Sequence, residues 1–200
     1  TVTVAIGPRF FQTLALTMER GREFTEWDAR LDAAGAIVSS RFAELLLSDR
    51  DPIGSRIRLI PANSSAAASR WFTVIGVAPE RFTGMVPMLQ PELWTAVAWV
   101  EDVEPAGIQD AVPSPTGTTR LDRRGQRWLF TKGRLKDGQT ADAVGANLGV
   151  IMKQLESAYP ATNRDRHTSV KLTNDVRILP QADAALVPVA AGLMLVVGLV

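Results

Sequence analysis

The residues suited to acid–base chemistry are few and scattered along the chain. His167 is the single histidine among 200 residues, and Asp165 and Asp175 lie near it in sequence. A serine hydrolase pairs such a histidine with a nucleophilic serine. A Gly-x-Ser-x-Gly turn commonly presents that serine, and the sequence lacks this turn. The neighbours of His167 are polar and charged, as in a solvated loop. A surface role for His167 is therefore favoured, and a membrane-anchored hydrolase that uses it is the weakest alternative.

The carboxylates and the absent cysteines argue against a metal site. Asp28 and Asp32 are four residues apart, so a helix would place both carboxylates on one face, but an exposed helix start is the simpler interpretation. The chain has no cysteine, which excludes disulfides, thiolate catalysis and cysteine-ligated zinc. With one histidine and no cluster of aspartates, the sequence predicts no catalytic residue, no metal and no cofactor.

A local group of arginines has two interpretations. Arg120, Arg123, Arg124 and Arg127 precede a predicted strand, and they suit either contact with anionic lipid headgroups or a plain solvated loop, which is favoured. Across the chain 22 Lys and Arg stand against 21 Asp and Glu, a net charge of +1. This balance gives no argument for a nucleic-acid partner.

Alternating and helical patterns predict a mixed α and β framework. Strands are expected at 2–6, 36–39, 56–60, 71–77, 93–98, 127–135 and 170–178. Helical segments are expected at 10–14, from Thr25, from Ser40 and from Thr140, and residues 20–24 are expected to form a compact turn. Residues 101–126 are rich in Pro, Gly, Asp and Thr and are expected to form a mobile loop.

The clearest pattern is a strand, a helix and a strand in the final third. Val144, Leu148, Ile151, Leu155 and Tyr159 recur at spacings of four, three, four and four, which is one face of a helix. Alternating residues on each side of this helix predict strands. The order predicts a βαβ unit whose helix packs on a sheet.

One apolar loop is a candidate contact surface. Phe82, Met85, Met88 and Leu89 lie in a stretch that Pro87 and Pro91 keep from being helical. Apolar loops that carry methionine adapt to varied partners, but a loop tucked onto a sheet has the same composition. Contact with a partner and burial against the sheet both stay open for these four residues.

The end of the chain is its most apolar part. Residues 184–200 carry no charge and no strongly polar side chain. A bilayer-spanning helix needs about 20 apolar residues, so this run of 17 predicts the start of a transmembrane helix. The rest of the chain is expected to be a soluble domain tied to lipid, in a fragment that starts and ends within a longer protein.

Several segments resemble, in order and spacing, the MacB-like periplasmic core domain. The first are Gly7–Leu14 and Glu19–Asp28, the latter similar to the family's pattern GR-x-f-t-x-x-D. The next are Ala36–Ser39 with Arg41–Ala43, Asp51–Ile57 with its DPIG turn, and Trp71–Val77. Phe82–Gly84, Trp94 and Gly133–Gly138 are similar to a subgroup of large duplicated permeases of the acidobacterial type.

The resemblance implies an α+β fold of βαβ units in two lobes. A porter-like lobe would take both chain ends and a second lobe would come from the middle, within an extracytoplasmic domain at 1–183 that precedes the membrane helix at 184–200. The implied place is the periplasmic or extracellular side of the bacterial inner membrane, in an FtsX/MacB-type ABC transporter permease.

The same resemblance implies a non-catalytic role. The domain would transmit ATP-driven conformational change across the membrane or handle an exported substrate. The implied partners are a cytoplasmic ABC ATPase subunit, membrane lipid through the C-terminal helix, a periplasmic partner or substrate, and a second permease in a dimer. The alternative from another class is the ligand-binding sensor ectodomain of a membrane receptor.

Overall fold

A computed structural model describes residues 2–28, 34–46, 48–61, 69–85, 89–103, 119–124 and 128–176. The chain divides into two compact units. The first is Thr1–Gly84 with Gln90–Arg134, and the second is Met85–Leu89 with Leu135–Val200. In the described residues, the first unit holds a sheet with short helices, and the second holds one long helix and a short one.

The described residues of the first unit form a mixed sheet. Its strands are β1 (Thr3–Ile6), β2 (Arg20–Gly21), β3 (Gly35–Val38), β4 (Arg56–Leu59), β5 (Arg70–Val77) and β6 (Leu93–Ala96). Its helices are α1 (Phe10–Thr13), α2 (Ser40–Leu46), the 3₁₀ turn η2 (Val97–Trp99) and α3 (Val100–Val103). The second unit contributes α4 (Ala141–Ala158), α5 (Pro160–Asn163) and the 3₁₀ turn η3 (Thr173–Asp175).

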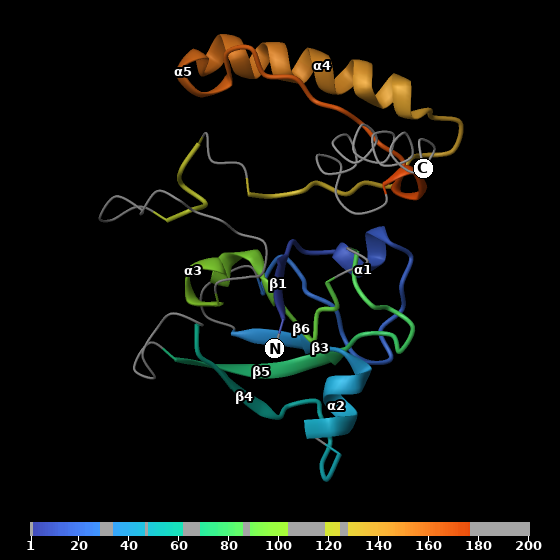
Figure 1. The fold of residues 1–200 in the computed structure, drawn as a ribbon, viewed down its shortest axis with the longest axis vertical. Coiled ribbons are helices and arrows are strands. Elements are labelled where there is room, and N and C mark those ends of the chain that lie inside the picture. The colour runs from blue at the N-terminus through green and yellow to red at the C-terminus, as the bar shows by residue number, and fades with distance from the viewer. Residues whose placement is uncertain are drawn as a thin grey trace, which may run out of the picture. The chain divides into compact units, whose positions relative to one another are not determined.

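Strand order in the sheet is β1-β6-β3-β5-β2, with β4 also paired to β5 (Figure 1). β1 runs parallel to β6 and β3 parallel to β5, whereas β3 and β6 are antiparallel. The segment between β3 and β5, which contains α2 and β4, therefore connects two parallel strands by a crossover. The mixed sheet with its helices confirms the expected α+β class.

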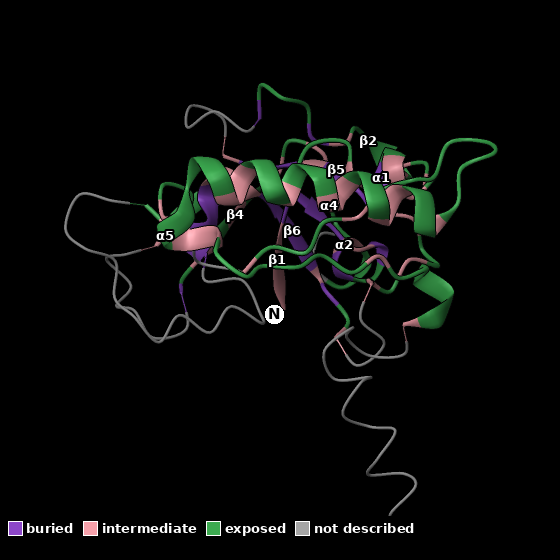
Figure 2. Ribbon diagram, turned by 90° about the horizontal axis from the view of Figure 1, so that it is seen from above, coloured by how far each residue is buried: buried purple, intermediate pink, exposed green. Residues whose placement is uncertain are grey.

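The core lies around the two central strands. Every residue of β3 and β6 is buried, which explains why their sequences do not alternate and are apolar except for Thr95. β4 instead alternates, with exposed Arg56 and Arg58 between half-buried Ile57 and Leu59. In Figure 2 the buried residues gather on the strands, and no residue of α4 is buried.

β5 is bordered by three strands. Along one side it pairs with β3, and along the other it pairs first with β4, through Arg70–Thr73, and then with β2, through Gly76 and Val77. The two-residue β2 lies where the sequence predicted only a turn. At this point Gly21 and Gly76 face each other. Only glycine suits both positions, because a Cβ on Gly21 would collide with the Ile75 carbonyl oxygen and a Cβ on Gly76 with the Arg22 carbonyl oxygen.

Two predicted strands of the final third are wrong in the described residues. Residues 128–135 have no regular secondary structure, and 170–176 hold only the turn η3, while 127, 177 and 178 lie outside the description. Alternation supplies one face of a strand but not the neighbour that its backbone must pair with. The side chains of Leu129 and Phe130 are 57% and 58% exposed, so no described segment packs closely over this stretch.

The predicted helix of the final third is confirmed as α4. It begins where expected, because the Thr140 hydroxyl accepts a hydrogen bond from the Ala143 N–H at 3.2 Å. Within the described residues no helix is both long and apolar enough to span a bilayer. The apolar run at 184–200 lies outside them.

Substituting Gly76→Ala tests the close approach of β2 and β5. The new Cβ would collide with the Arg22 carbonyl oxygen, so we expect the free energy of unfolding to fall by about 1–3 kcal/mol. Gly7→Ala is the control, since a Cβ there meets nothing within 4 Å. Urea unfolding measures both, and equal midpoints for the two variants would contradict the described register.

Candidate functional site

The residues first considered for catalysis do not form a site in the described chain. His167, Asp165 and Asp175 are all exposed. Among the residues that the structure describes, no three His, Asp or Glu side chains gather closely enough to hold a metal ion. Asp32, the predicted companion of Asp28, lies outside the described residues.

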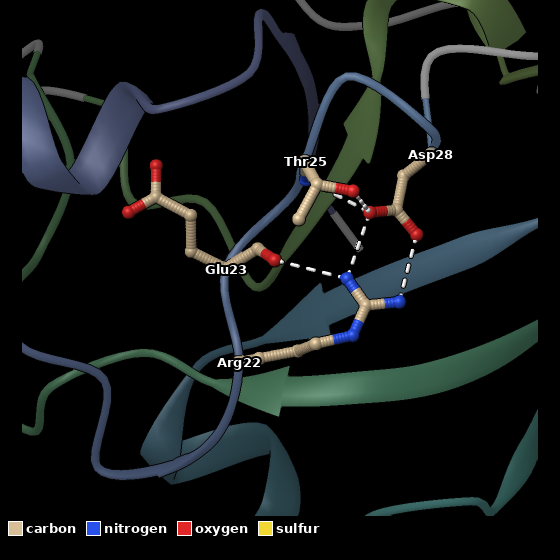
Figure 3. Close-up of polar contacts among 4 residues, drawn as sticks. All are labelled: Arg22, Glu23, Thr25 and Asp28. Carbon is tan, nitrogen blue, oxygen red and sulfur yellow. Dashed lines mark hydrogen bonds and ion pairs between the residues drawn. The ribbon is translucent and has the colours of Figure 1, made fainter.

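Asp28 is instead buried in an ion pair that closes the segment after β2. Its side chain is 4% exposed, and its two carboxylate oxygens accept hydrogen bonds from the Arg22 guanidinium at 2.7 and 2.9 Å. The Thr25 N–H and hydroxyl donate to the same carboxylate at 2.8 and 2.7 Å, as Figure 3 shows. The Glu23 carbonyl oxygen also accepts from Arg22. The expected exposure of Asp28 is therefore wrong, and residues 29–33, into which the predicted helix would continue, lie outside the described residues.

Electrostatics keep this pair ionised. Hydrogen bonds from Arg22 first, and then from Thr25, hold the pKa of Asp28 well below its usual range, although burial opposes them. The hydrogen bond to Asp28 raises the pKa of Arg22 in turn. Both carboxylate oxygens of Asp28 already accept hydrogen bonds, so the ion pair is suited to holding the loop in place rather than to transferring a proton. We call Arg22, Thr25 and Asp28 the loop clasp.

An aromatic cluster lies beside the loop that follows β5. The Phe82 ring stacks on Trp94 with centroids 5.7 Å apart, and it meets the edge of Phe11 at 5.5 Å. Phe10 contacts both phenylalanine rings. Phe11 and Trp94 are fully buried, whereas Phe82 is half-buried. This packing orders the start of the loop that carries the predicted contact residues.

The other predicted contact residues lie further along that loop. Met85 and Leu89 are half-buried, and Met88 lies outside the described residues. The predicted basic group is only partly described: Arg124 is exposed, Arg120 and Arg123 are half-buried, and Arg127 lies outside. The Arg120 backbone N–H donates to Glu101 at 2.5 Å, which fixes the turn at 119–122.

Sequence reasoning missed the loop clasp as a structural unit. The signal was present in the spacing Arg22–Thr25–Asp28, since a threonine followed three residues later by an acid is a recognised capping pattern. The Asp28 carboxylate does accept from the Thr25 N–H, as that pattern requires. The arginine six residues before Asp28 turns the cap into a bidentate ion pair.

A family model for the MacB-like periplasmic core domain matches residues 1–150. This chain belongs to that family. Membership confirms the resemblance seen in the motifs, and it makes the chain part of the periplasmic or extracellular domain of an ABC-type permease. A search of curated proteins gives no match.

Three solved structures are similar to this MacB-like chain. The periplasmic region of MacB from Actinobacillus actinomycetemcomitans is 17% identical, with a TM-score of 0.46, over 80% of this chain and 58% of that one. A domain of a protein described as a permease, from Porphyromonas gingivalis, is 18% identical, with a TM-score of 0.45, over 88% and 71%. The extracellular domain of the noncanonical ABC-type transporter YknZ from Gram-positive bacteria is 21% identical, with a TM-score of 0.36, over 50% and 44%.

Asp28→Asn tests whether the loop clasp stabilises the fold. We expect a loss of about 2 kcal/mol at pH 7, because the charge-assisted hydrogen bonds from Arg22 weaken. The folded pKa of Asp28 lies below its unfolded value of about 3.9, so its contribution is present above that pH and is lost as the pH falls through the folded pKa. The gap between the native protein and the variant should therefore shrink in acid.

Chemical unfolding from pH 7 down to pH 2 measures this gap. Glu26→Gln is the matched control: its partner Arg9 lies 3.4 Å away and both side chains are largely exposed, so the expected loss is within about 0.5 kcal/mol. A loss at Asp28 that stays constant across this pH range would contradict the assigned role of its charge.

Proposed function

We propose that this domain transmits ATP-driven conformational change across the membrane, or handles an exported substrate, as the extracytoplasmic part of an ABC transporter permease. The observation that carries the proposal is the family match over residues 1–150. The chain spans 58% of the MacB periplasmic region that it resembles, so the role of the whole protein is inferred from the family.

The support for a transmitter role comes from the way the first unit is packed, not from a group of catalytic side chains. The first unit has a continuous core around β3 and β6, and Phe24, in the segment that the loop clasp closes, is buried in that core. A stiff unit of this kind passes on a displacement instead of absorbing it. ATP-driven movement of membrane helices changes such a domain only if it favours one arrangement of the domain over another.

The proposed partners follow from the same role. A cytoplasmic ATPase subunit would supply the energy, and residues 184–200 would begin the helix that follows the extracytoplasmic domain at 1–183. A second permease would complete a dimer, and a periplasmic partner or substrate would contact the domain. We keep the inserted-lobe arrangement, the duplicated-permease subgroup and the location in the bacterial inner membrane as parts of this proposal.

We also propose that the loop of Phe82, Met85, Met88 and Leu89 contacts that partner or substrate. Polar substitutions Met85→Gln and Met88→Gln should leave the thermal midpoint unchanged and abolish the response to partner or substrate. Phe82→Ala is the contrasting variant, because loss of its stacking on Trp94 should lower the midpoint by several degrees. A comparable drop for the methionine variants would mark them as core residues and overturn the contact.

The transport role itself is tested in the intact membrane protein. Purification from membranes should bring an ATP-hydrolysing subunit with it. Because this chain lacks cysteine, spin labels at Thr73→Cys and Lys153→Cys, one in each unit, can report their separation. We expect the distance distribution to change between the nucleotide-free and vanadate-trapped states.

The matched control carries both labels in the first unit, at Arg41→Cys and Thr73→Cys, and its distances should stay constant. Purification without any ATPase, and distances that respond to a small ligand but not to nucleotide, would favour the sensor ectodomain instead.

A further inference from the structure

A pocket of about 300 Å³ lies at the edge of the sheet where the parallel strands β3 and β5 end. Val77, the last residue of β5, lines it, and so does Ser40, two residues after the end of β3. Glu19 lies beside Val77, because its backbone N–H donates to the Val77 carbonyl oxygen at 3.0 Å. Open α/β sheets bind their ligands outside the carboxyl ends of the strands. The pocket therefore occupies a position suited to binding.

The Ser40 hydroxyl opens into this pocket without a partner. Ser40 is only 5% exposed, and in the described part of the chain its Oγ makes no hydrogen bond but keeps contact with solvent. Because Ser40 lines the pocket, that contact is made there. Ser39 provides the contrast, since its Oγ accepts from the Phe42 N–H at 3.1 Å and caps α2. Ser40 is thus a buried hydroxyl that the fold leaves unused, and a ligand that reaches it would satisfy it.

Two carboxylates line the same pocket. Glu44 follows Ser40 by four residues in α2, so the two side chains share one face of the helix. The side chains of Glu19 and Glu44 are exposed, and within the described ranges neither makes a hydrogen bond or an ion pair. Both carboxylates therefore remain available to a ligand that enters the pocket.

The two arginines that line the pocket are already paired. Arg20 contacts Asp51 at 3.1 Å, and Arg50 contacts Asp49 at 3.2 Å. Together with the two glutamates, two cations thus stand against four carboxylates, so the charge around the pocket is negative. The unused groups are hydrogen-bond acceptors. This combination favours a cation that carries several N–H donors.

We propose that this pocket binds an aliphatic primary amine. An ammonium group carries three N–H donors and no acceptor, which matches the carboxylates of Glu19 and Glu44 and the Ser40 hydroxyl. The alkyl chain would contact half-buried Ala43 and buried Val77. The volume is at the lower end for ligand pockets, which suits a short amine or one lysine side chain. The proposal goes beyond the transport role, because binding here needs no movement of the domain.

The test uses the membrane protein that contains this chain, reconstituted in lipid nanodiscs, with any cysteine outside the chain replaced. A trifluoromethyl tag at Ser48→Cys, an exposed position of the pocket that takes no part in the proposed contacts, reports binding by fluorine NMR. We expect butylamine to shift the signal saturably, whereas equal concentrations of butanol or sodium chloride should not. Glu19→Gln/Glu44→Gln should weaken butylamine binding by about tenfold or more, because charge-assisted hydrogen bonds are lost.

Glu26→Gln/Glu80→Gln is the matched control, since it removes two exposed carboxylates elsewhere in the first unit and should leave the affinity unchanged. Ser40→Ala separates binding from stability. It should weaken butylamine binding by about threefold, as expected for one neutral hydrogen bond. The thermal midpoint should not fall, because the Ser40 hydroxyl has no partner in the described fold.

An equal response to butanol would overturn the proposal, because apolar contact alone would then explain the shift. Affinity that is unchanged in Glu19→Gln/Glu44→Gln, or that falls equally in the matched control, would overturn it too.

A tripeptide with a central lysine and blocked ends distinguishes the sources of the ammonium group. Tighter binding of the peptide than of butylamine would support a lysine side chain as the ligand, and weaker binding would support a free amine. No saturable shift with either would overturn the proposal. None of these outcomes involves the ATPase association or the nucleotide-dependent distances, so a failure here is distinguishable from a failure of the transport role.

Discussion

The close approach of β2 to β5 is the constraint on which the first unit depends. β5 has hydrogen-bonding partners along both of its sides. On the side away from β3, β4 pairs with Arg70–Thr73 and β2 pairs with Gly76 and Val77, where Gly21 lies against Gly76. Arg22 follows directly, and its N–H donates to the Ile75 carbonyl oxygen at 2.9 Å. That bond sets where the Arg22 side chain begins, so the ion pair with Asp28 is a consequence of sheet register.

The loop clasp and the aromatic cluster then fix what lies around the sheet. The clasp holds the chain that leaves β2 before it returns as β3. The stacking of Phe82 on Trp94 ties the loop after β5 to β6. The clasp closes a short segment between Arg22 and Asp28, whereas the aromatic cluster joins segments far apart in sequence. Both groups lie in the part of the chain that the MacB-like family model matches.

Much of the sheet could be predicted from the sequence, and the failures have physical causes. All the described strands except β2 were predicted, because four or more residues are enough to show alternation or a largely apolar run. β2 has two residues and thus no period to detect. The strands at 127–135 and 170–178 had good alternation, but a pattern says nothing about whether a neighbouring strand is present to pair with.

The candidate site was less predictable because it depends on contacts between distant residues. Exposure of Asp28 was inferred from local spacing, while its burial depends on Arg22 being held by β5. The register that places Arg58 of β4 opposite Trp71 of β5 was equally hidden, because alternation within each strand does not say which residues of the two strands pair. Family motifs succeeded where local reasoning failed, since their order and spacing record the arrangement as a whole.

The central claim is that this chain is the extracytoplasmic part of a membrane permease. The most direct measurement is labelling of Lys153→Cys, an exposed position on α4, by a membrane-impermeant maleimide in cells that contain the intact protein. The account predicts full labelling without lysis, with a cytoplasmic control cysteine labelled only after lysis. Labelling of Lys153→Cys that also requires lysis would place the chain in the cytoplasm and contradict the account.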